Sequence, residues 1–367
     1  MIPINLPRIG EEEIEAVARV MRTGFLTSGL GAGPMVTEFE KKFAKFANAK
    51  YAIAVNTGTA ALHCAMVAAG VKPGDEVILP SFTFVATAEA VVLAGGKPVF
   101  VDIDPATFII SPAGIEKAIT KKTTAVVPVD LYGLPAEIEP IKEIVSKHGI
   151  AIVEDAAQAH GARCEGKSAG AFADVACWSL YASKNMTTGE GGVVTTDSES
   201  FAETVRMVRT HGEKAKYASL MLGCNYRMGE IEAAMGVVQL KRLPDFVAKR
   251  RENVRRLTRI LTKTKRLKLP SEPKGGRHSW YLYTVRIKDA TMNERDKIVS
   301  ELQDKGIGAM VYYLHPVHLM PYYRNSFGKF KLPETEKAAQ RVLSLPIHPG
   351  VTEEQIDYIG KTLLELL

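Results

Sequence analysis

Three side chains near the middle of the chain could do chemistry together. Asp155 lies at the carboxyl end of an apolar run, residues 150–153, and Ser179 lies near the end of a second run, residues 174–180. Lys184 follows this second run and leads into a glycine-rich turn. Open α/β sheets bind ligands at the carboxyl ends of their strands, so we expect the acid, the hydroxyl and the amine to meet there. Pyridoxal phosphate requires a partner for its ring nitrogen, a phosphate contact and an amine, and these residues can supply all three.

A turn further upstream is a candidate phosphate site. The expected strand at residues 51–55 leads into a helix whose first residues include Gly58 and Thr59. Gly58 lets the backbone approach an anion, and Thr59 adds a hydroxyl beside the free amides of a helix N-terminus. The same turn could instead serve only to cap the helix. Taken with the hydroxyl and the amine downstream, it favours phosphate binding.

The elements that must position these residues alternate between strands and helices. Apolar runs predict strands at residues 51–55, 76–79, 99–104, 125–129, 150–153, 174–180 and 192–196, with helices such as 136–147 and 201–209 between them. Two amphipathic helices, 11–21 and 35–46, come first, separated by a glycine-rich loop. This order predicts an α/β fold with a doubly wound, mainly parallel mixed sheet flanked by helices.

The pattern changes after residue 240. A helix of small residues is expected to end there, and a basic helix begins at Lys241. Strands at 280–287 and 307–313 and a helix at 292–305 then predict a smaller α+β domain. The length of 367 residues allows two domains. We therefore expect an N-terminal arm (1–20) associated with the small domain, a large domain (21–240) and a small C-terminal domain (241–367).

The basic segment from Lys241 to Lys268 carries most of the excess charge. It holds twelve Lys or Arg and two acids, a net +10, so the remainder of this +6 chain carries 6 − 10 = −4. Val247, Val254, Leu257 and Leu261 recur at helical spacing, which predicts one apolar face and a solvated basic face. The alternative is a nucleic-acid-binding regulator that uses this helix, but no DNA-reading motif accompanies it. The basic face could also lie near an anionic substrate.

Other features narrow the class of protein. The chain has no apolar run of bilayer length, and its first residues lack the regions of a signal peptide, so we expect a cytoplasmic protein that contacts no membrane. The four cysteines form no Cys-x-x-Cys pair. His315 and His318 have the spacing of metal ligands, but no acid or cysteine lies close in the sequence. We therefore expect no metal site.

Seven segments together resemble a known family. In order they are NTGTAALH, PSFTFVATAEAV, VEDAAQAHGA, SLYASKN, GEGG, GCNYR and LHPVHLMPYY. They resemble the DegT/DnrJ/EryC1/StrS family of pyridoxal-phosphate sugar aminotransferases, which has fold type I of the aspartate aminotransferase-like superfamily. The resemblance runs from about residue 5 to the C-terminus. It implies amino transfer from a donor, L-glutamate, to a nucleotide-linked keto-sugar for amino-sugar or polysaccharide biosynthesis, with a 4-keto-6-deoxy sugar favoured over a 3-keto sugar.

The resemblance also assigns cofactor contacts. Lys184 would bond to the cofactor aldehyde and later shuttle a proton between substrate carbon and cofactor. Asp155 would keep the ring nitrogen protonated, and Gln158 would face the ring hydroxyl. Phe84, rather than Phe82, falls where the family places its stacking aromatic.

The remaining assignments concern the phosphate, the partner subunit and the substrate. Gly58, Thr59 and Ser179 would hold the phosphate, and Asn225 would reach it across the interface of a homodimer, with no nucleic acid as partner. The substrate candidates are Thr27, Ser28, Arg227, Tyr312, His315 and Arg324.

Two positions bear on related chemistries. The family often has histidine where this chain has Asp130, which casts doubt on substrate contacts there. One branch of the family replaces the cofactor-binding lysine by histidine and dehydrates its substrate, and Lys184 argues against that branch. A cyclitol aminotransferase or a sugar dehydratase of the same fold remains the alternative.

Overall fold

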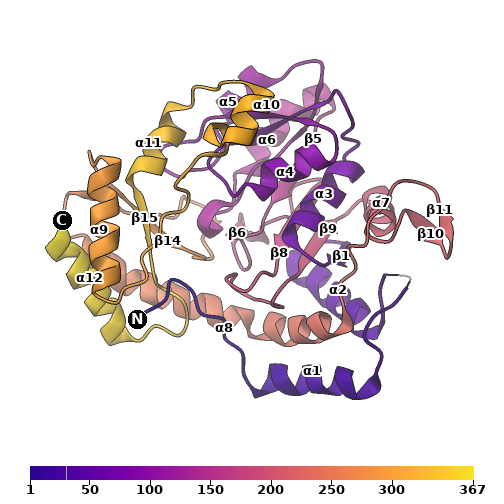
Figure 1. The fold of residues 1–367 in the computed structure, drawn as a ribbon, viewed down its shortest axis with the longest axis horizontal. Helices are drawn as coiled ribbons and strands as arrows, with labels where there is room; N and C mark the ends of the chain where they lie inside the picture. The colour runs from indigo at the N-terminus through magenta and orange to yellow at the C-terminus, as the bar shows by residue number, and fades with distance from the viewer. Residues whose placement is uncertain (30) are drawn as a thin grey trace.

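The computed structural model describes residues 1–29 and 31–367, and a seven-stranded sheet lies at its centre (Figure 1). In spatial order its strands are β1 (Tyr51–Val55), β9 (Gly192–Thr196), β8 (Val175–Ser179), β5 (Ala151–Asp155), β4 (Thr123–Val126), β2 (Glu76–Pro80) and β3 (Lys97–Val101). Only β9 runs antiparallel to its neighbours β1 and β8 within this sheet. The predicted mixed, mainly parallel sheet is confirmed.

Helices cover both faces of this sheet because its strands bury side chains on both sides. On β2, Val77 and Leu79 pack into one core while Ile78 packs into another. The first core lies against α3 (Gly58–Ala68), α4 (Ala86–Leu93) and α7 (Glu199–Arg209). The opposite face packs against α2 (Pro34–Ala47), α5 (Pro112–Ala118), α6 (Ile138–Val145) and the first half of α8 (Glu230–Leu261). Strand ends are therefore the places where polar side chains can reach solvent or a ligand.

One helix, α8, replaces the two that we predicted around residue 241. It spans 32 residues, and α1 (Glu11–Thr23) lies along its first half (Figure 1). Glu13 joins the two helices, because its carboxylate accepts hydrogen bonds from Arg242 at 2.6 and 2.7 Å. The predicted apolar stripe is buried, since Val247, Val254, Leu257 and Leu261 are each at most 5% exposed. The division of the chain at residue 241 stays a prediction, because α8 runs through that position.

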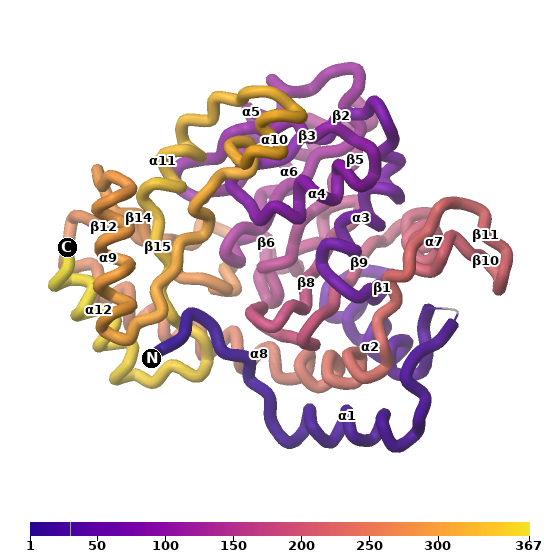
Figure 2. The backbone as a smooth tube through the Cα atoms, viewed as in Figure 1, coloured from indigo at the N-terminus to yellow at the C-terminus, as the bar shows by residue number. Residues whose placement is uncertain are grey.

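The C-terminal part forms a smaller α+β layer at one end of α8. Its sheet has the order β12 (Leu267–Lys268), β14 (Tyr283–Ile287) and β15 (Val342–Leu345). Its helices are α9 (Met292–Asp304), α11 (Pro333–Arg341) and α12 (Glu353–Leu366), whereas α10 (Pro321–Phe327) packs on the large sheet, where Tyr323 joins the first core. The predicted strand at 307–313 is wrong: these described residues form only isolated bridges, with Ile2 and Ser344. Both chain termini lie at this end of the molecule (Figure 2).

Short elements complete the chain. They are β6 (Arg163–Cys164), β7 (Lys167–Ser168), β10 (Glu213–Ala215), β11 (Ala218–Ser219), β13 (Gly276–Arg277) and the 3-10 turns η1 (Leu131–Gly133), η2 (Ser146–His148) and η3 (Val317–Leu319). The β10–β11 hairpin projects from the end of the molecule opposite the termini (Figure 1). No helix in the described ranges, 1–29 and 31–367, combines the length and apolar character of a membrane span.

The arginines of the basic segment are largely used inside the chain. Arg250 is buried and donates to the carbonyls of Trp280 and Tyr281 at 3.2 and 3.0 Å. Arg251 donates to Glu272 at 2.6 Å, and Arg256 donates to both oxygens of Asp357 and to Glu353. Guanidinium groups committed to internal carbonyls and carboxylates are not free to bind phosphates. The structure therefore gives the nucleic-acid alternative no support.

Candidate active site

Asp155 ends β5, and its carboxylate is held from two directions. Oδ2 accepts a hydrogen bond of 2.8 Å from the hydroxyl of Thr87 in the first turn of α4, and Oδ1 accepts one of 3.2 Å from the amide of Ala157. Burial raises the pKa of Asp155, although these two bonds and the charge of Lys184 oppose the rise. A protonated ring nitrogen would meet a carboxylate whose orientation is already fixed.

Lys184 shares the electrostatic environment of Asp155. Burial lowers the pKa of Lys184 to about 8, and the charge of Asp155 opposes this fall. The Nζ atom lies 4.7 Å from the centre of the Tyr281 ring, whose hydroxyl is 2.9 Å from Ser183 Oγ. The lowered pKa makes the neutral amine, which is the form that attacks an aldehyde, more abundant near neutral pH.

The predicted phosphate residues meet at the ends of β8 and α3. Thr57 caps α3, and its hydroxyl accepts from the amide of Ala60 at 3.0 Å. The amides of Gly58 and Thr59, in the same first turn, have no partner among the described residues. A Cβ atom on Gly58 would lie 2.7 Å from Cβ of Ser179, so only glycine fits this contact. Free amides, a helix N-terminus and a hydroxyl are the groups that bind phosphate. The site therefore fits the phosphate of pyridoxal phosphate.

The structure separates the two candidate stacking aromatics. Phe82 is fully buried in the core, whereas Phe84 is 55% exposed beside α4 and its ring centre lies 6.2 Å from that of Tyr313. Gln158 is held by its neighbours: Oε1 accepts from the amide of Tyr132 at 2.7 Å, and Nε2 donates to the hydroxyl of Tyr313 at 3.0 Å. One N–H of this amide is left for a ring hydroxyl. Of the two candidate aromatics, the exposed Phe84 is therefore the one available to a ligand.

Asn225 lies on the edge of the molecule next to the phosphate residues. It is exposed, and its carbonyl accepts from Nδ2 of Asn56 at 3.4 Å. Asn225 also forms a bridge with Thr210, and a Cβ atom on Gly31 would lie 2.7 Å from the hydroxyl of Thr210. Arg227 forms the next bridge, with Val55 of β1, and is half-buried. Asn225, Arg227 and the loop before α2 therefore share one edge.

The remaining substrate candidates fall into two groups. Thr27 and Ser28 lie between α1 and α2, where the carbonyl of Leu26 accepts from the amide of Glu230 at 3.0 Å. Lys184 instead lines a small cavity together with Phe246. Gln239 and Phe246 of α8, which both line this cavity, lie nine and sixteen positions beyond Glu230, about 14 and 24 Å along the helix. The structure therefore does not bring Thr27 and Ser28 to Lys184 within one chain. Leu30, in the same loop, lies outside the described residues.

The second group lies on either side of Tyr313 along the chain, at residues 312–324. Tyr312 is half-buried, its carbonyl accepts from the hydroxyl of Tyr132, and burial raises the pKa of Tyr312 to about 12. His315 and Arg324 are exposed. His318 is buried, with Nδ1 2.7 Å from the hydroxyl of Ser81 at the end of β2. His318 thus ties this segment to the large sheet.

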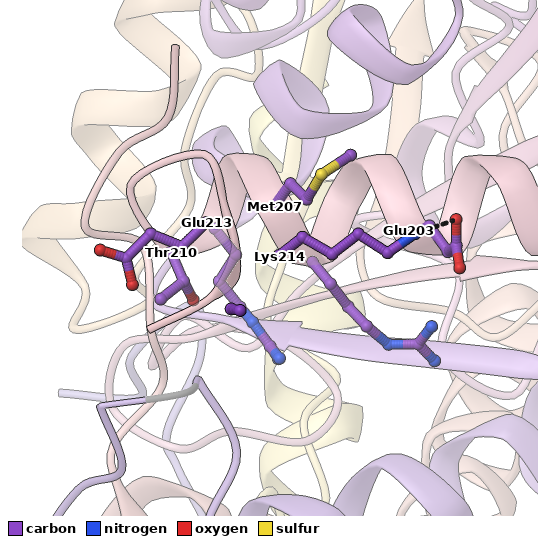
Figure 3. Close-up of a pocket in the computed structure, with 8 residues that line it drawn as sticks. Glu203, Met207, Thr210, Glu213 and Lys214 are labelled. Atoms are coloured by element: carbon purple, nitrogen blue, oxygen red, sulfur yellow. Dashed lines mark ion pairs between the residues drawn. The ribbon is translucent and has the colours of Figure 1, made fainter. Parts of the chain in front are cut away.

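Figure 3 shows a separate hollow of about 280 Å³ between α7 and the β10–β11 hairpin. Lys214 crosses it toward Glu203, with Nζ and Oε2 3.7 Å apart. The other lining residues are Arg206, Met207, Arg209, Thr210, Glu213 and Ala215. None of the predicted cofactor residues lines this hollow, so we assign it no part in cofactor binding.

Sequence reasoning missed several residues of the site. Thr87, Tyr281 and Tyr313 touch Asp155, Lys184 and Gln158, respectively, but they come from segments far apart in the sequence. For Thr87 a local signal existed, because it lies in the segment that carries Phe84. Tyr313 likewise adjoins Tyr312, a predicted substrate residue, whereas Tyr281 had no such signal.

Known proteins resemble this chain in sequence over nearly its whole length. The sequence matches the DegT/DnrJ/EryC1/StrS aminotransferase family over residues 7–364. A pleiotropic regulatory protein of Geobacillus stearothermophilus is 40% identical over 353 residues, which cover 95% of this chain and 94% of the relative. GDP-perosamine synthase of Caulobacter vibrioides is 38% identical over 369 residues, covering 100% of this chain and 98% of the relative.

A solved structure extends the likeness to the bound cofactor. The pyridoxal-phosphate form of Spr1654 from Streptococcus pneumoniae superposes with a TM-score of 0.93 at 29% identity, covering 100% of this chain and 99% of that one. Fold and cofactor therefore agree with what the strand-end residues indicate.

Proposed function

This chain belongs to the DegT/DnrJ/EryC1/StrS aminotransferase family, and we propose that it transfers an amino group from L-glutamate to a nucleotide-linked keto-sugar. It is a sugar aminotransferase that depends on pyridoxal phosphate. A relative named for a GDP-linked product supports the nucleotide-linked acceptor. Within that class we favour a 4-keto-6-deoxy sugar over a 3-keto sugar.

The observation that carries this proposal is that Lys184 and Asp155 lie at the ends of neighbouring strands, where the charge of each shifts the pKa of the other. Asp155 lies opposite Cys177 of the parallel neighbour β8, whose carboxyl end leads to Lys184, and the charge of each residue acts on the pKa of the other. Bound pyridoxal phosphate supplies a ring that withdraws electrons from the carbon next to the transferred nitrogen. Asp155 would hold the proton on the ring nitrogen, and Nζ of Lys184 would move the proton on and off the substrate carbon.

The other residues would bind and orient the cofactor. The amides of Gly58 and Thr59 and the hydroxyl of Ser179 would hold its phosphate at the start of α3. Phe84 would cover one face of the ring, and the free N–H of Gln158 would reach the ring hydroxyl. These roles rest on the free amides and the exposed aromatic described above.

The second subunit of a homodimer would complete the site. Asn225 is exposed on the edge that also carries the loop with Thr27 and Ser28, and that loop lies away from Lys184 in its own chain. Both segments could reach a partner's site if this edge forms the dimer interface. Arg227, Tyr312, His315 and Arg324 are the residues that we propose for the acceptor's diphosphate and sugar.

Borohydride trapping tests the cofactor linkage. The purified protein, supplied with pyridoxal phosphate, should show a visible absorbance band, and reduction should leave a mass adduct on the peptide that contains Lys184. Lys184→Ala should lose both signals, while Lys265→Ala, at an exposed lysine, should retain both. An adduct on another lysine would contradict the assignment.

Product analysis tests the reaction. A panel of keto-sugar nucleotides should yield amino sugars only when glutamate is added, and 2-oxoglutarate should appear in equal amount. A sugar dehydratase would instead release water from the sugar without forming 2-oxoglutarate. A cyclitol aminotransferase would aminate none of the keto-sugar nucleotides in the panel.

A further inference from the structure

Two further acids lie next to Asp155. Glu154 precedes it on β5, and Asp130 follows β4 at the start of η1. The backbone amide of Asp130 donates to the carbonyl of Asp155 at 3.0 Å, so the two segments are joined at this strand end. Asp130 and Glu154 are at most 1% exposed. Any charge on these two acids is therefore felt at the candidate active site.

Each acid uses one oxygen for a backbone amide and keeps the other buried without a donor among the described residues. Oδ1 of Asp130 accepts from Ala136 at 2.8 Å, and Oε1 of Glu154 accepts from Gly170 at 2.8 Å. Oδ2 of Asp130 and Oε2 of Glu154 are buried and receive no hydrogen bond from any donor of the described residues. The parallel bridge between Val129 and Asp155 puts Asp130 and Glu154 on the same face of the sheet at adjacent strand ends, where the charge of Glu154 raises the pKa of Asp130. Two carboxylates cannot bond without a proton between them.

The surroundings supply no positive charge for this pair. Neither acid takes part in an ion pair among the described residues. The charged group that acts on both is Asp155, which is also an acid, and the charge of Glu154 helps to raise the pKa of the thiols of Cys164 and Cys177. Two ionised carboxylates in this position would repel each other and Asp155 at the same time.

We propose that Asp130 and Glu154 share a single proton and act together as positioning residues that keep the charge behind Asp155 to one negative unit. The proposal rests on the proposed role of Asp155 toward the cofactor ring. Loss of the shared proton would add a second negative charge, favour protonation of Asp155 and weaken its hold on the ring nitrogen.

This inference corrects the expectation for Asp130. The histidine that is frequent at this position in the family raised doubt about substrate contacts, but Asp130 is fully buried and cannot touch a substrate. A histidine here could donate an N–H to Glu154. An aspartate can do so only as the protonated acid, which is why the proton must be held by the protein itself.

Two isosteric variants test the shared proton. In Asp130→Asn and in Glu154→Gln, an amide N–H replaces the proton, so each variant keeps one negative charge without a titratable proton. Infrared spectroscopy should detect a protonated buried carboxyl in the native protein at neutral pH, and both variants should lack this band. Asp104→Asn, at an exposed carboxylate that accepts from the amide of Ala106 at 2.8 Å, serves as the matched control and should keep the band.

The pH dependence of unfolding gives a second readout. Burial raises the pKa of both acids. At pH values above the ordinary carboxyl pKa, the native pair therefore holds one proton more than the same two acids in the unfolded chain. Native stability should therefore fall with rising pH more steeply than that of either single variant, by the slope of one proton. The double variant places two amide donors face to face and should be less stable than either single variant.

These measurements need no substrate, so they distinguish a failure of this inference from a failure of the proposed function. A third readout links the two: the native protein should lose affinity for pyridoxal phosphate at alkaline pH in a transition that Asp130→Asn and Glu154→Gln lack. Absence of the native carboxyl band, or equal pH slopes in native and variant proteins, would overturn the proposal. Asp130→His, which offers Glu154 an N–H donor, should fold and also lack the band.

Discussion

The hydroxyl of Thr87 donates a hydrogen bond of 2.8 Å to Oδ2 of Asp155, and the hydroxyl of Thr83 lies 2.9 Å from that of Thr87. All three side chains are buried. The two hydroxyls therefore link the segment before α4 to the carboxylate at the end of β5. Because this bond favours the ionised acid, it lowers the pKa of Asp155 against the effect of burial.

Replacing Thr87 by valine should weaken cofactor binding. The variant keeps the shape of the side chain but removes the donor, so the pKa of Asp155 rises further. A hydrogen bond to a charged group contributes about 1.5–3 kcal/mol, which predicts a loss of about tenfold or more in affinity for pyridoxal phosphate. A titration followed by visible absorbance measures this loss. Thr87→Ser retains the hydroxyl and should bind nearly as well as the native protein; equal loss in both variants would point to packing instead.

The amine of Lys184 should titrate near neutral pH. With its pKa lowered to about 8, the rate of attachment of pyridoxal phosphate to the protein should rise as pH increases toward 8 and then level off. The charge of Asp155 raises the pKa of Lys184, so Asp155→Asn should move the midpoint to lower pH. Stopped-flow absorbance across this pH range measures both midpoints. A midpoint near the ordinary lysine value of about 10.4 would contradict the burial of the amine.

A methyl group at Gly58 should disturb the phosphate end selectively. Its Cβ would lie 2.7 Å from that of Ser179, and relief of such overpacking costs about 1–3 kcal/mol. Gly58→Ala should lose about tenfold in affinity for pyridoxal phosphate and little for pyridoxal, which lacks the phosphate. Gly114→Ala in α5 is the control, because its Cβ would make only ordinary contacts of 3.6 Å. Equal losses for both ligands would mean that the strain spreads beyond the phosphate.

Much of this architecture could be predicted from the sequence. Apolar runs gave β1 and β9 their observed bounds, and strand-end reasoning selected Asp155, Ser179 and Lys184 because polar groups converge at one edge of a parallel sheet. The run at 307–313 misled because it meets its neighbours at single residues only, Ile307 at Ile2 and Met310 at Ser344 of β15, while its apolar residues pack into the cores.

What the sequence could not supply is contact between distant segments. The bond from Thr87 to Asp155 spans 68 positions, and the pairing of Asp130 with Glu154 depends on the register of β4 against β5. The basic segment likewise looked solvated, but Arg250 is buried under carbonyls of the C-terminal part. Only tertiary packing decides which charges remain exposed.

The ion pair between α1 and α8 should contribute to stability in a pH-dependent way. Burial raises the pKa of Glu13, but hydrogen bonds from Gln239, the amide of Gly10 and Arg242 outweigh it, so the net shift is downward. Glu13→Gln should therefore lower the free energy of unfolding at pH 7 by about 1–3 kcal/mol. The difference should shrink as pH falls through the lowered pKa, where the native carboxylate also becomes protonated. Denaturant unfolding at both pH values measures it. Glu12→Gln, in an exposed pair with Lys241, should change little.

Mixing two inactive or weakened variants tests whether Asn225 acts across a dimer. Asn225→Ala should weaken phosphate binding, and Lys184→Ala should abolish activity. In a mixed dimer, the chain that keeps Lys184 would receive Asn225 from its Lys184→Ala partner, so that one site regains native affinity for pyridoxal phosphate. The exposed position of Asn225 beside Asn56 makes this exchange geometrically reasonable. Mixtures refolded together should recover activity of up to about one native site per mixed dimer, and unmixed samples should not. Recovery no greater than the sum of the separate variants would place Asn225 in its own chain's site and remove the partner from the proposal.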